Sequence, residues 1–270
     1  MRSRTMKSKY TLFPKGIHSL VIILFLANIS VAKAEIPSES NGIVLQGTRV
    51  IYPSNEKNGI TFTVTNRTSQ VYLLQSRVLS WPVLAAQDDL QLSEETKGEV
   101  TTNAPFIVLP PLIRFAPLDE MTLRIRLTKN TLPVDRESVF MLALKAIPAQ
   151  SDSEERSGAK MVLALQNSLK LFYRPEGLPF MDGDERAKQL QFSHQGMQLE
   201  VKNPTPYYVT MSDISVDMDS VSLEGHSMIA PFSVEHYGLS TSGGRSVSWQ
   251  IIDDNGLKST VQTQRLNTAL

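Results

Sequence analysis

The chain has 270 residues, with 27 basic and 27 acidic side chains, four histidines and no cysteine. An apolar fraction of 41% is enough to build packed cores, which excludes wholesale disorder. The lack of cysteine excludes disulfides, thiolate metal sites and a cysteine nucleophile, and four histidines leave little material for a zinc centre. Six of the basic residues and none of the acidic ones lie in residues 1–34, so the rest of the chain is net acidic, which argues against nucleic-acid binding.

The first 34 residues have the three parts of a secretory signal. Five cations precede an apolar run at residues 20–27, and small residues at Ala32 and Ala34 fit a signal peptidase site. We therefore predict cleavage between Ala34 and Glu35 and an exported product. The alternative, a membrane anchor, is disfavoured because the apolar run is short for crossing about 30 Å of hydrocarbon.

The remainder of the chain shows the period-two alternation of β-strands. The clearest runs place apolar residues at positions 60, 62 and 64, at 123, 125 and 127, at 197, 199 and 201, and at 247, 249 and 251. Turn-forming pairs such as Asn66-Arg67, Asn203-Pro204, Gly243-Gly244 and Asn255-Gly256 separate the runs, and no sustained helical period follows the signal. This rhythm favours an all-β protein, and its length favours two β-sandwich domains.

Two prolines and a glycine interrupt the strand pattern at residues 175–179, which is the best candidate for a domain boundary. The predicted organisation is a signal peptide at 1–34, a first domain at 35–177 and a second domain at 178–270. The polar segment 149–160 lies within the first domain and is interpreted as a long exposed hairpin connection.

The run at residues 161–175 is apolar on both faces at its start. Met161, Leu163 and Leu165 share one face, and Val162 and Ala164 share the other. A strand with two apolar faces needs cover on both. It is either a central core strand or a strand that offers one face to another protein.

Four sequence blocks resemble the periplasmic chaperones of the chaperone–usher pilus pathway. They are LKLFYRP at 169–175, LPVDRESVF at 132–140, PPLIRFAP at 110–117 and NPTPYYVT at 203–210. They occur in the family's order and together span most of residues 42–255. The resemblance implies two immunoglobulin-like domains in a boomerang arrangement, without cofactor or metal.

The resemblance also implies a function. Such a chaperone binds, folds and caps pilus subunits that lack their last strand, then delivers them to the outer-membrane usher in the bacterial envelope. It fills the subunit's groove by β-augmentation. The donor residues implied here are Met161, Leu163 and Leu165, with Ala159 as an outer member. The sequence leaves open whether the free protein caps this strand as a self-capping dimer.

The family's anchor for the subunit's C-terminal carboxylate maps onto Arg49, in TRVIY at 48–52, and onto Lys170. An arginine fork and a lysine point charge suit a carboxylate. Taken alone, Arg49 would be interpreted as a solvated strand-end cation and Lys170 as a residue that snorkels to water. Glu137, Arg174 and Asp254 match the family's interdomain salt bridge, with Asp253 as a competing neighbour of Asp254.

This chain departs from the family's long-loop branch, because that branch usually carries a cysteine pair beside the donor strand. We therefore favour the short-loop branch.

Two other function classes fit the sequence less well. An enzyme is disfavoured because His194, His226 and His236 have no metal-ligand spacing and no phosphate-binding glycine motif is present. A structural pilus subunit or adhesin is disfavoured because such a subunit is typically a single incomplete domain with a disulfide.

Overall fold

A computed structural model describes residues 42–81, 104–149, 163–241 and 244–266 of the chain. The predicted signal peptide with its cleavage site, the donor residues Ala159 and Met161, and Gly243 of the predicted Gly243-Gly244 turn lie outside the described residues. Within the described parts, secondary structure is almost entirely β-strand, with one short helix, so the all-β prediction is confirmed. The described helix is too short and too polar to span a membrane.

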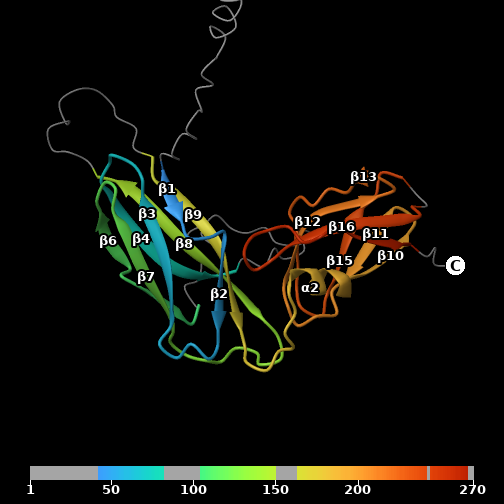
Figure 1. Ribbon diagram of the computed structural model, residues 1–270, viewed down its shortest axis with the longest axis horizontal. Helices are drawn as coiled ribbons and strands as arrows, with labels where there is room; N and C mark the ends of the chain where they lie inside the picture. Colours follow the sequence, from blue (N-terminus) through green and yellow to red (C-terminus); the bar gives the residue numbers. More distant parts are fainter. Residues whose placement is uncertain (1–41, 82–103, 150–162, 242–243, 267–270) are drawn as a thin grey trace, which may run out of the picture. The chain divides into compact units, whose positions relative to one another are not determined.

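The first domain is a sandwich of two sheets (Figure 1). One sheet has the order β1-β3-β7-β5, formed by β1 (Ile43–Leu45), β3 (Ile60–Asn66), β7 (Glu120–Leu127) and β5 (Phe106–Leu109). The other has the order β2-β9-β8-β4-β6, formed by β2 (Arg49–Pro53), β9 (Leu165–Arg174), β8 (Ser138–Pro148), β4 (Tyr72–Ser80) and β6 (Leu112–Phe115). All pairs are antiparallel except β2 and β9, which run parallel.

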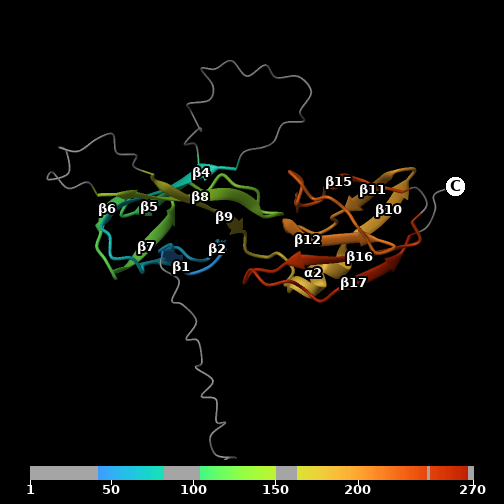
Figure 2. The ribbon, with the colours of Figure 1, turned by 90° about the horizontal axis from the view of Figure 1, so that it is seen from above.

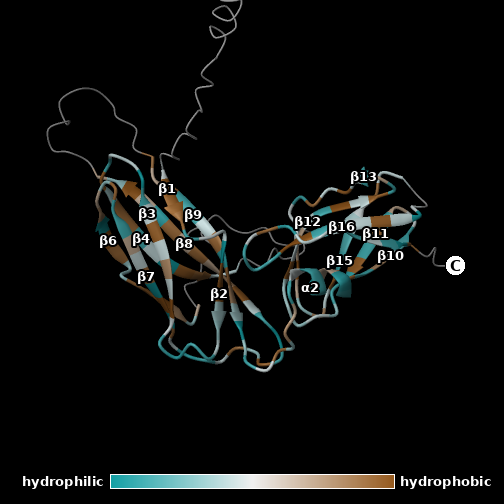
Figure 3. Cartoon of the chain, in the orientation of Figure 1, coloured by the Kyte–Doolittle hydropathy of each residue, from teal (hydrophilic) through white to brown (hydrophobic). Residues whose placement is uncertain are grey.

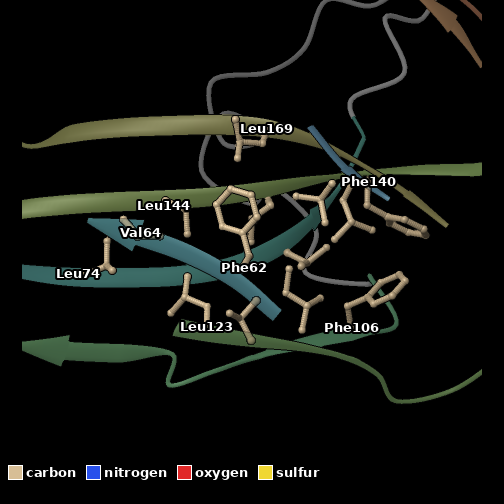
Figure 4. Close-up of a cluster of buried hydrophobic side chains, with 14 of the residues drawn as sticks. Phe62, Val64, Leu74, Phe106, Leu123, Phe140, Leu144 and Leu169 are labelled. Atoms are coloured by element: carbon tan, nitrogen blue, oxygen red, sulfur yellow. The ribbon is translucent and has the colours of Figure 1, made fainter. Parts of the chain in front are cut away.

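Alternating side chains from both sheets fill the space between them. Figure 4 shows Phe62 and Val64 of β3 and Leu123 of β7 pointing toward Leu74 of β4 and Leu144 of β8. Leu123 is fully buried and Leu144 nearly so, and in β3 and β7 the residues between the buried ones are exposed or half-buried, which gives the interleaved hydropathy seen along the strands in Figure 3. The period-two pattern of the sequence thus predicted the core face of β3 and β7 correctly.

The second domain is built in the same way from shorter strands. One sheet has the order β10-β11-β15, formed by β10 (Gln191–Gln195), β11 (Gln198–Lys202) and β15 (Val234–Gly238). The other has the order β13-β12-β16-β17, formed by β13 (Asp219–Ser220), β12 (Val209–Val216), β16 (Ser246–Ile252) and β17 (Gln262–Arg265), with β14 (Met228–Ile229) also paired to β12. A second apolar cluster, which includes Leu199, Met211 and Trp249, fills this sandwich.

A seven-residue helix, α2 (Gly183–Gln189), covers part of the second sandwich beside β16 (Figure 2). It was not anticipated from the sequence. Asp182 caps it by accepting a hydrogen bond from Glu185 N at 2.8 Å, and the Glu185 carboxylate accepts from Asp182 N at 3.0 Å. This capping box was the available signal. The predicted domain boundary between residues 177 and 178 falls in the segment that joins β9 to α2 and stays a prediction.

In each domain, a buried asparagine side chain closes one loop through hydrogen bonds to the main chain. Asn66 at the end of β3 and Asn203 just after β11 are fully buried, and each amide donates to main-chain carbonyls. Each side-chain oxygen accepts from the main-chain N and the hydroxyl of a threonine two residues later, Thr68 or Thr205. Asn-Arg and Asn-Pro were expected to mark turns, and the buried amides explain why asparagine is needed there.

Candidate functional site

Strand β9 contains three of the predicted site residues, Leu165, Lys170 and Arg174. On one side it pairs with β2, the outermost strand of the sheet, from Arg49↔Lys170 to Pro53↔Arg174. On the other side it pairs with β8, from Ala146↔Leu165 to Ser138↔Tyr173. Among the described residues, the edge of β9 at residues 165–169 therefore has no partner on the β2 side, although its main-chain groups are available to pair.

Among the described residues of the predicted strand at 161–175, β9 covers Leu165–Arg174, and residues 163 and 164 precede its first pair with β8. Leu163 is 65% exposed and Leu165 is 60% exposed. Both have the parity of Leu169, Leu171 and Tyr173, whose side chains fill the core of the first domain. The core-facing row of β9 thus continues through the half-buried Asn167 to two exposed leucines, Leu165 and Leu163, beside an open edge.

The opposite face of β9 carries Lys170, Phe172 and Arg174. Phe172 is buried outside the first core, with its ring centroid 6.0 Å from that of Tyr208 in the second domain. Arg49 lies directly across from Lys170 and shares this face, and its guanidinium lies 5.9 Å from the Phe172 ring. The parallel register of β2 and β9 therefore places the two predicted anchor cations side by side.

Each anchor cation makes one hydrogen bond to the second domain. Arg49 Nη1 donates to Ile252 O at 3.0 Å, and Lys170 Nζ donates to Thr210 Oγ1 at 3.1 Å. Arg49 Nε is buried and has no partner among the described residues. Within that part of the chain, neither cation has a carboxylate within 4.0 Å. Because an unpaired buried donor is costly, the pair favours an incoming anion.

Burial acts on both cations. It lowers the pKa of Lys170 to about 8, and the charge of Arg49 adds to the effect. Burial also lowers the pKa of Arg49, while the nearby Asp254 carboxylate opposes this shift. At neutral pH both side chains still carry their charges, so the site is a partly desolvated dication.

The third predicted group forms a closed network. Arg174 Nε donates to Glu137 Oε1 at 2.8 Å, and its Nη1 and Nη2 donate to the two oxygens of Asp254 at 2.8 and 3.1 Å. Glu137 is 2% exposed, and its other oxygen accepts from Tyr208 N at 2.9 Å. Arg174 is thus held by one carboxylate from each domain.

Burial and neighbouring charges shift the pKa values of the network's members in different directions. Burial raises the pKa of Glu137, and the Arg174 guanidinium opposes that shift. For Asp254 burial works in the same direction, but hydrogen bonds and charges from Arg174 and Arg186 outweigh it and lower the pKa. The two carboxylates likewise overcome the effect of burial on Arg174 and raise its pKa.

Two members of this network were missed by the sequence analysis. Arg186 of α2 contacts Asp254 Oδ1 at 2.9 Å, and the Tyr207 ring lies 5.0 Å from the Arg174 guanidinium and 5.3 Å from that of Arg186. Arg186 is placed by the short helix, which the sequence did not predict, while Tyr207 lies in the 203–210 block and is held by a hydrogen bond from its hydroxyl to Pro179 O. Asp253, the competing neighbour, instead accepts from Asn255 N and Leu257 N within its own turn.

Three histidines were predicted to lack metal-ligand spacing. Among the described residues, no group of three or more His, Cys, Asp or Glu side chains is arranged to hold a metal ion. The geometry therefore defines a two-domain β-sandwich protein with an open apolar strand edge and a partly buried cation pair. An open strand edge of this kind can bind another polypeptide by strand pairing.

Comparison with known proteins identifies the family. Residues 42–179 match the family model described as pili and flagellar-assembly chaperone, PapD N-terminal domain, and residues 185–263 match pili assembly chaperone PapD, C-terminal domain. The chain therefore belongs to the pilus-assembly chaperones. Their role is non-enzymatic folding and delivery in the periplasm, with pilus subunits and the usher as partners, and the comparisons do not favour the alternative of a pilus subunit or adhesin.

Curated relatives agree along most of their length. The chain is 34% identical over 236 residues to chaperone protein LpfB of Salmonella typhimurium, covering 85% of this chain and 91% of the relative. It is 31% identical to chaperone protein FimC of Escherichia coli K12, with 87% of both chains covered.

Solved structures agree as well. The crystal structure of the E. coli chaperone DraB matches with a TM-score of 0.66 and 31% identity, covering 84% of this chain and 97% of DraB. A chain of the Salmonella enterica SafA pilin–SafB chaperone complex matches with a TM-score of 0.68 and 26% identity, covering 83% of this chain and 96% of that chain.

The depressed pKa of Lys170 predicts that its charge destabilises the folded protein. The unfolded chain binds the proton more tightly, so the free energy of unfolding rises with pH between about 8 and the ordinary lysine pKa of 10.5. Below that window, Lys170→Met should raise the free energy of unfolding by roughly 1 kcal/mol, because part of the burial penalty is screened by solvent.

Urea unfolding of both proteins at pH 7 and pH 10.5 measures this effect. The advantage of Lys170→Met should be present at pH 7 and absent at pH 10.5. A variant that is less stable than the wild-type protein at pH 7 would contradict the interpretation of this site as strained by charge.

Proposed function

We propose that this chaperone captures a pilus subunit by adding the exposed row of β9 to the subunit's open groove and by binding the subunit's C-terminal carboxylate with Arg49 and Lys170. The observation that carries the proposal is the coincidence of the two features on one strand. The open edge at residues 165–169 ends where Lys170 begins its pairing with Arg49.

The exposed row supplies the apolar contacts. Leu163 and Leu165 are exposed leucines on the core-facing parity of β9, and the proposed row continues through Met161 and Ala159, which lie outside the described residues. Each aliphatic side chain buried in a groove contributes about 1.5–3 kcal/mol of transfer free energy before ordering costs. Main-chain hydrogen bonds along the open edge would add affinity without requiring a particular subunit sequence.

The cation pair sets the register of this pairing. A slip of one residue would turn every leucine away from the groove, so a fixed end point is needed. A terminal carboxylate is an anionic group present once in every chain, and the desolvated Arg49–Lys170 pair offers it strong charge-assisted hydrogen bonds. The distance along β9 from Lys170 to Leu165 then decides which subunit residues face the donor row.

The network of Glu137, Arg174 and Asp254 adjoins the anchor site. Arg174 lies two pairs beyond Phe172 on the same face, and Asp254 lies two residues after Ile252, whose carbonyl accepts from Arg49. We assign the network the task of holding the second domain against the anchor.

For export, we assign the cut between Ala34 and Glu35 to signal peptidase, which N-terminal sequencing of the periplasmic protein would test.

Removal of either anchor cation should abolish capture and leave the fold intact. We expect Arg49→Ala or Lys170→Ala to reduce the subunit copurified from the periplasm at least tenfold, because half of the carboxylate grip is lost. The assay is coexpression with the candidate subunits encoded beside the chaperone gene. Arg77→Ala, which removes an exposed arginine of β4, is the matched control, and equal subunit yields from all these proteins would refute the anchor.

A charge placed in the donor row should block groove filling. Leu163→Glu or Leu165→Glu would carry an unpaired carboxylate into an apolar groove, and we expect loss of the copurified complex. Gln166→Glu adds the same charge to an exposed position on the opposite face of β9 and should leave capture unchanged. The donor assignment is wrong if the leucine variants and the Gln166 variant behave alike.

Loss of the shared carboxylate should loosen the second domain. Asp254→Ala leaves the guanidinium groups of Arg174 and Arg186 without their common partner. We expect a larger radius of gyration in small-angle scattering and weaker capture. Asp213→Ala, which breaks an exposed ion pair with Lys258, is the control and should change neither. Scattering of Asp254→Ala that matches the wild-type curve would remove this role.

A further inference from the structure

The Lys170 ammonium is held by one group from each domain. Its Nζ lies 5.8 Å from the centroid of the Trp81 ring, and it donates a hydrogen bond of 3.1 Å to Thr210 Oγ1. Trp81 directly follows β4 of the first domain, and Thr210 lies in β12 of the second. Neither residue was singled out by the sequence analysis.

Strand register explains why Trp81 lies there. Leu79, Met141 and Lys170 are direct cross-strand partners in β4, β8 and β9, so their side chains share one face of the sheet. Trp81 comes two residues after Leu79 and therefore returns to that face. The indole thus directly follows a strand whose register with β8 and β9 is fixed up to Ser80.

The position of Thr210 is fixed by burial and by strand pairing. It is 8% exposed, and β12 pairs it with Ile252 of β16 and with Met228 of β14. The Thr210–Ile252 pair supplies one acceptor to each anchor cation, since Thr210 Oγ1 accepts from Lys170 and Ile252 O accepts from Arg49. One cross-strand pair of the second domain therefore orients the whole dication.

Both contacts favour the charged form of the lysine. The face of an indole attracts an ammonium ion and has no comparable attraction for a neutral amine. A hydroxyl oxygen accepts a stronger hydrogen bond from an ammonium than from an amine. An ammonium has three donors, so the bond to Thr210 leaves two that can reach a carboxylate.

We propose that Trp81 and Thr210 are positioning residues that keep the Lys170 ammonium charged and aimed at the subunit's terminal carboxylate. This inference rests on the proposed function, because the aim matters only if Lys170 grips that group. The other charged group that faces Lys170 is Arg49 on β2; its neighbours on β8, β4 and β12 are Met141, Trp81 and Thr210, which carry no charge.

The first test needs no subunit. The pKa of Lys170 is measured by NMR titration of the lysine side chains in the free protein, with Lys170→Arg to assign its signal. We expect Trp81→Leu and Thr210→Val each to lower this pKa by about half a unit or more, from its value near 8. Trp81→Phe and Thr210→Ser, which keep a ring face and a hydroxyl, should restore most of it. Thr122→Val, at an exposed position of β7, is the control and should change nothing.

The second test is the pH profile of subunit capture between pH 6.5 and 9. Capture by Trp81→Leu and Thr210→Val should approach the wild-type level at pH 6.5 and fall at least about twofold below it at pH 8, since a drop of half a unit from a pKa near 8 halves the charged fraction there. A purely structural role would lower capture at every pH and leave the Lys170 pKa unchanged.

Different results would overturn the positioning role of Trp81 and Thr210 and the anchor role of Lys170. An unchanged pKa of Lys170 in both variants overturns the positioning role, even if capture is lost. Wild-type capture by Lys170→Ala overturns the anchor and with it the proposed function, whatever pKa values the variants show.

Discussion

The structure depends on how two neighbouring groups of buried cations are neutralised. Arg174 is surrounded by acceptors, with Glu137 on one side and Asp254 on the other. Four residues earlier on the same strand, Lys170 lies beside Arg49, and within the described residues this pair has only neutral oxygens as partners. Burial of charge without a counterion is unfavourable, so the first group is a complete ion-pair network, while the second is the group to which we assign an incoming anion.

Strand β9 connects these features with the proposed donor row. Over ten residues it passes from an open edge with an exposed leucine, through the cation pair, to the Arg174 network. Because successive side chains alternate, one face of the strand fills the first core and then extends outward, while the other face meets the second domain. A single register therefore fixes the distance between the apolar row and the charge that ends it, which is what a template for another chain's strand requires.

Much of this could be predicted from the sequence. Period-two alternation predicted the strands and their core faces correctly, since Phe62, Leu123 and Trp249 are buried as expected. The blocks around residues 49, 137, 170, 174 and 254 were carried by resemblance, because alternation alone cannot tell which of many outward charges meet in space. The choice between Asp253 and Asp254 was open for the same reason, and it was decided by a turn that uses the first carboxylate internally.

The features that were missed depend on three-dimensional placement. Arg186 reaches Asp254 from a helix of two turns, which is too short for a helical period to show in the sequence. Trp81 and Thr210 lie far from Lys170 along the chain, and only the registers of β4, β8 and β12 bring them to its ammonium. Local signals existed only for the helix, as the Asp182–Glu185 capping box.

Amide hydrogen exchange of the chaperone, free and bound to a copurified subunit, tests the central claim most directly. The account predicts new protection at the main-chain amides of residues 163–169, because the open edge of β9 becomes paired, with no comparable change in the outer strands β5 and β6. A tight complex in which residues 163–169 exchange as fast as in the free protein would contradict it.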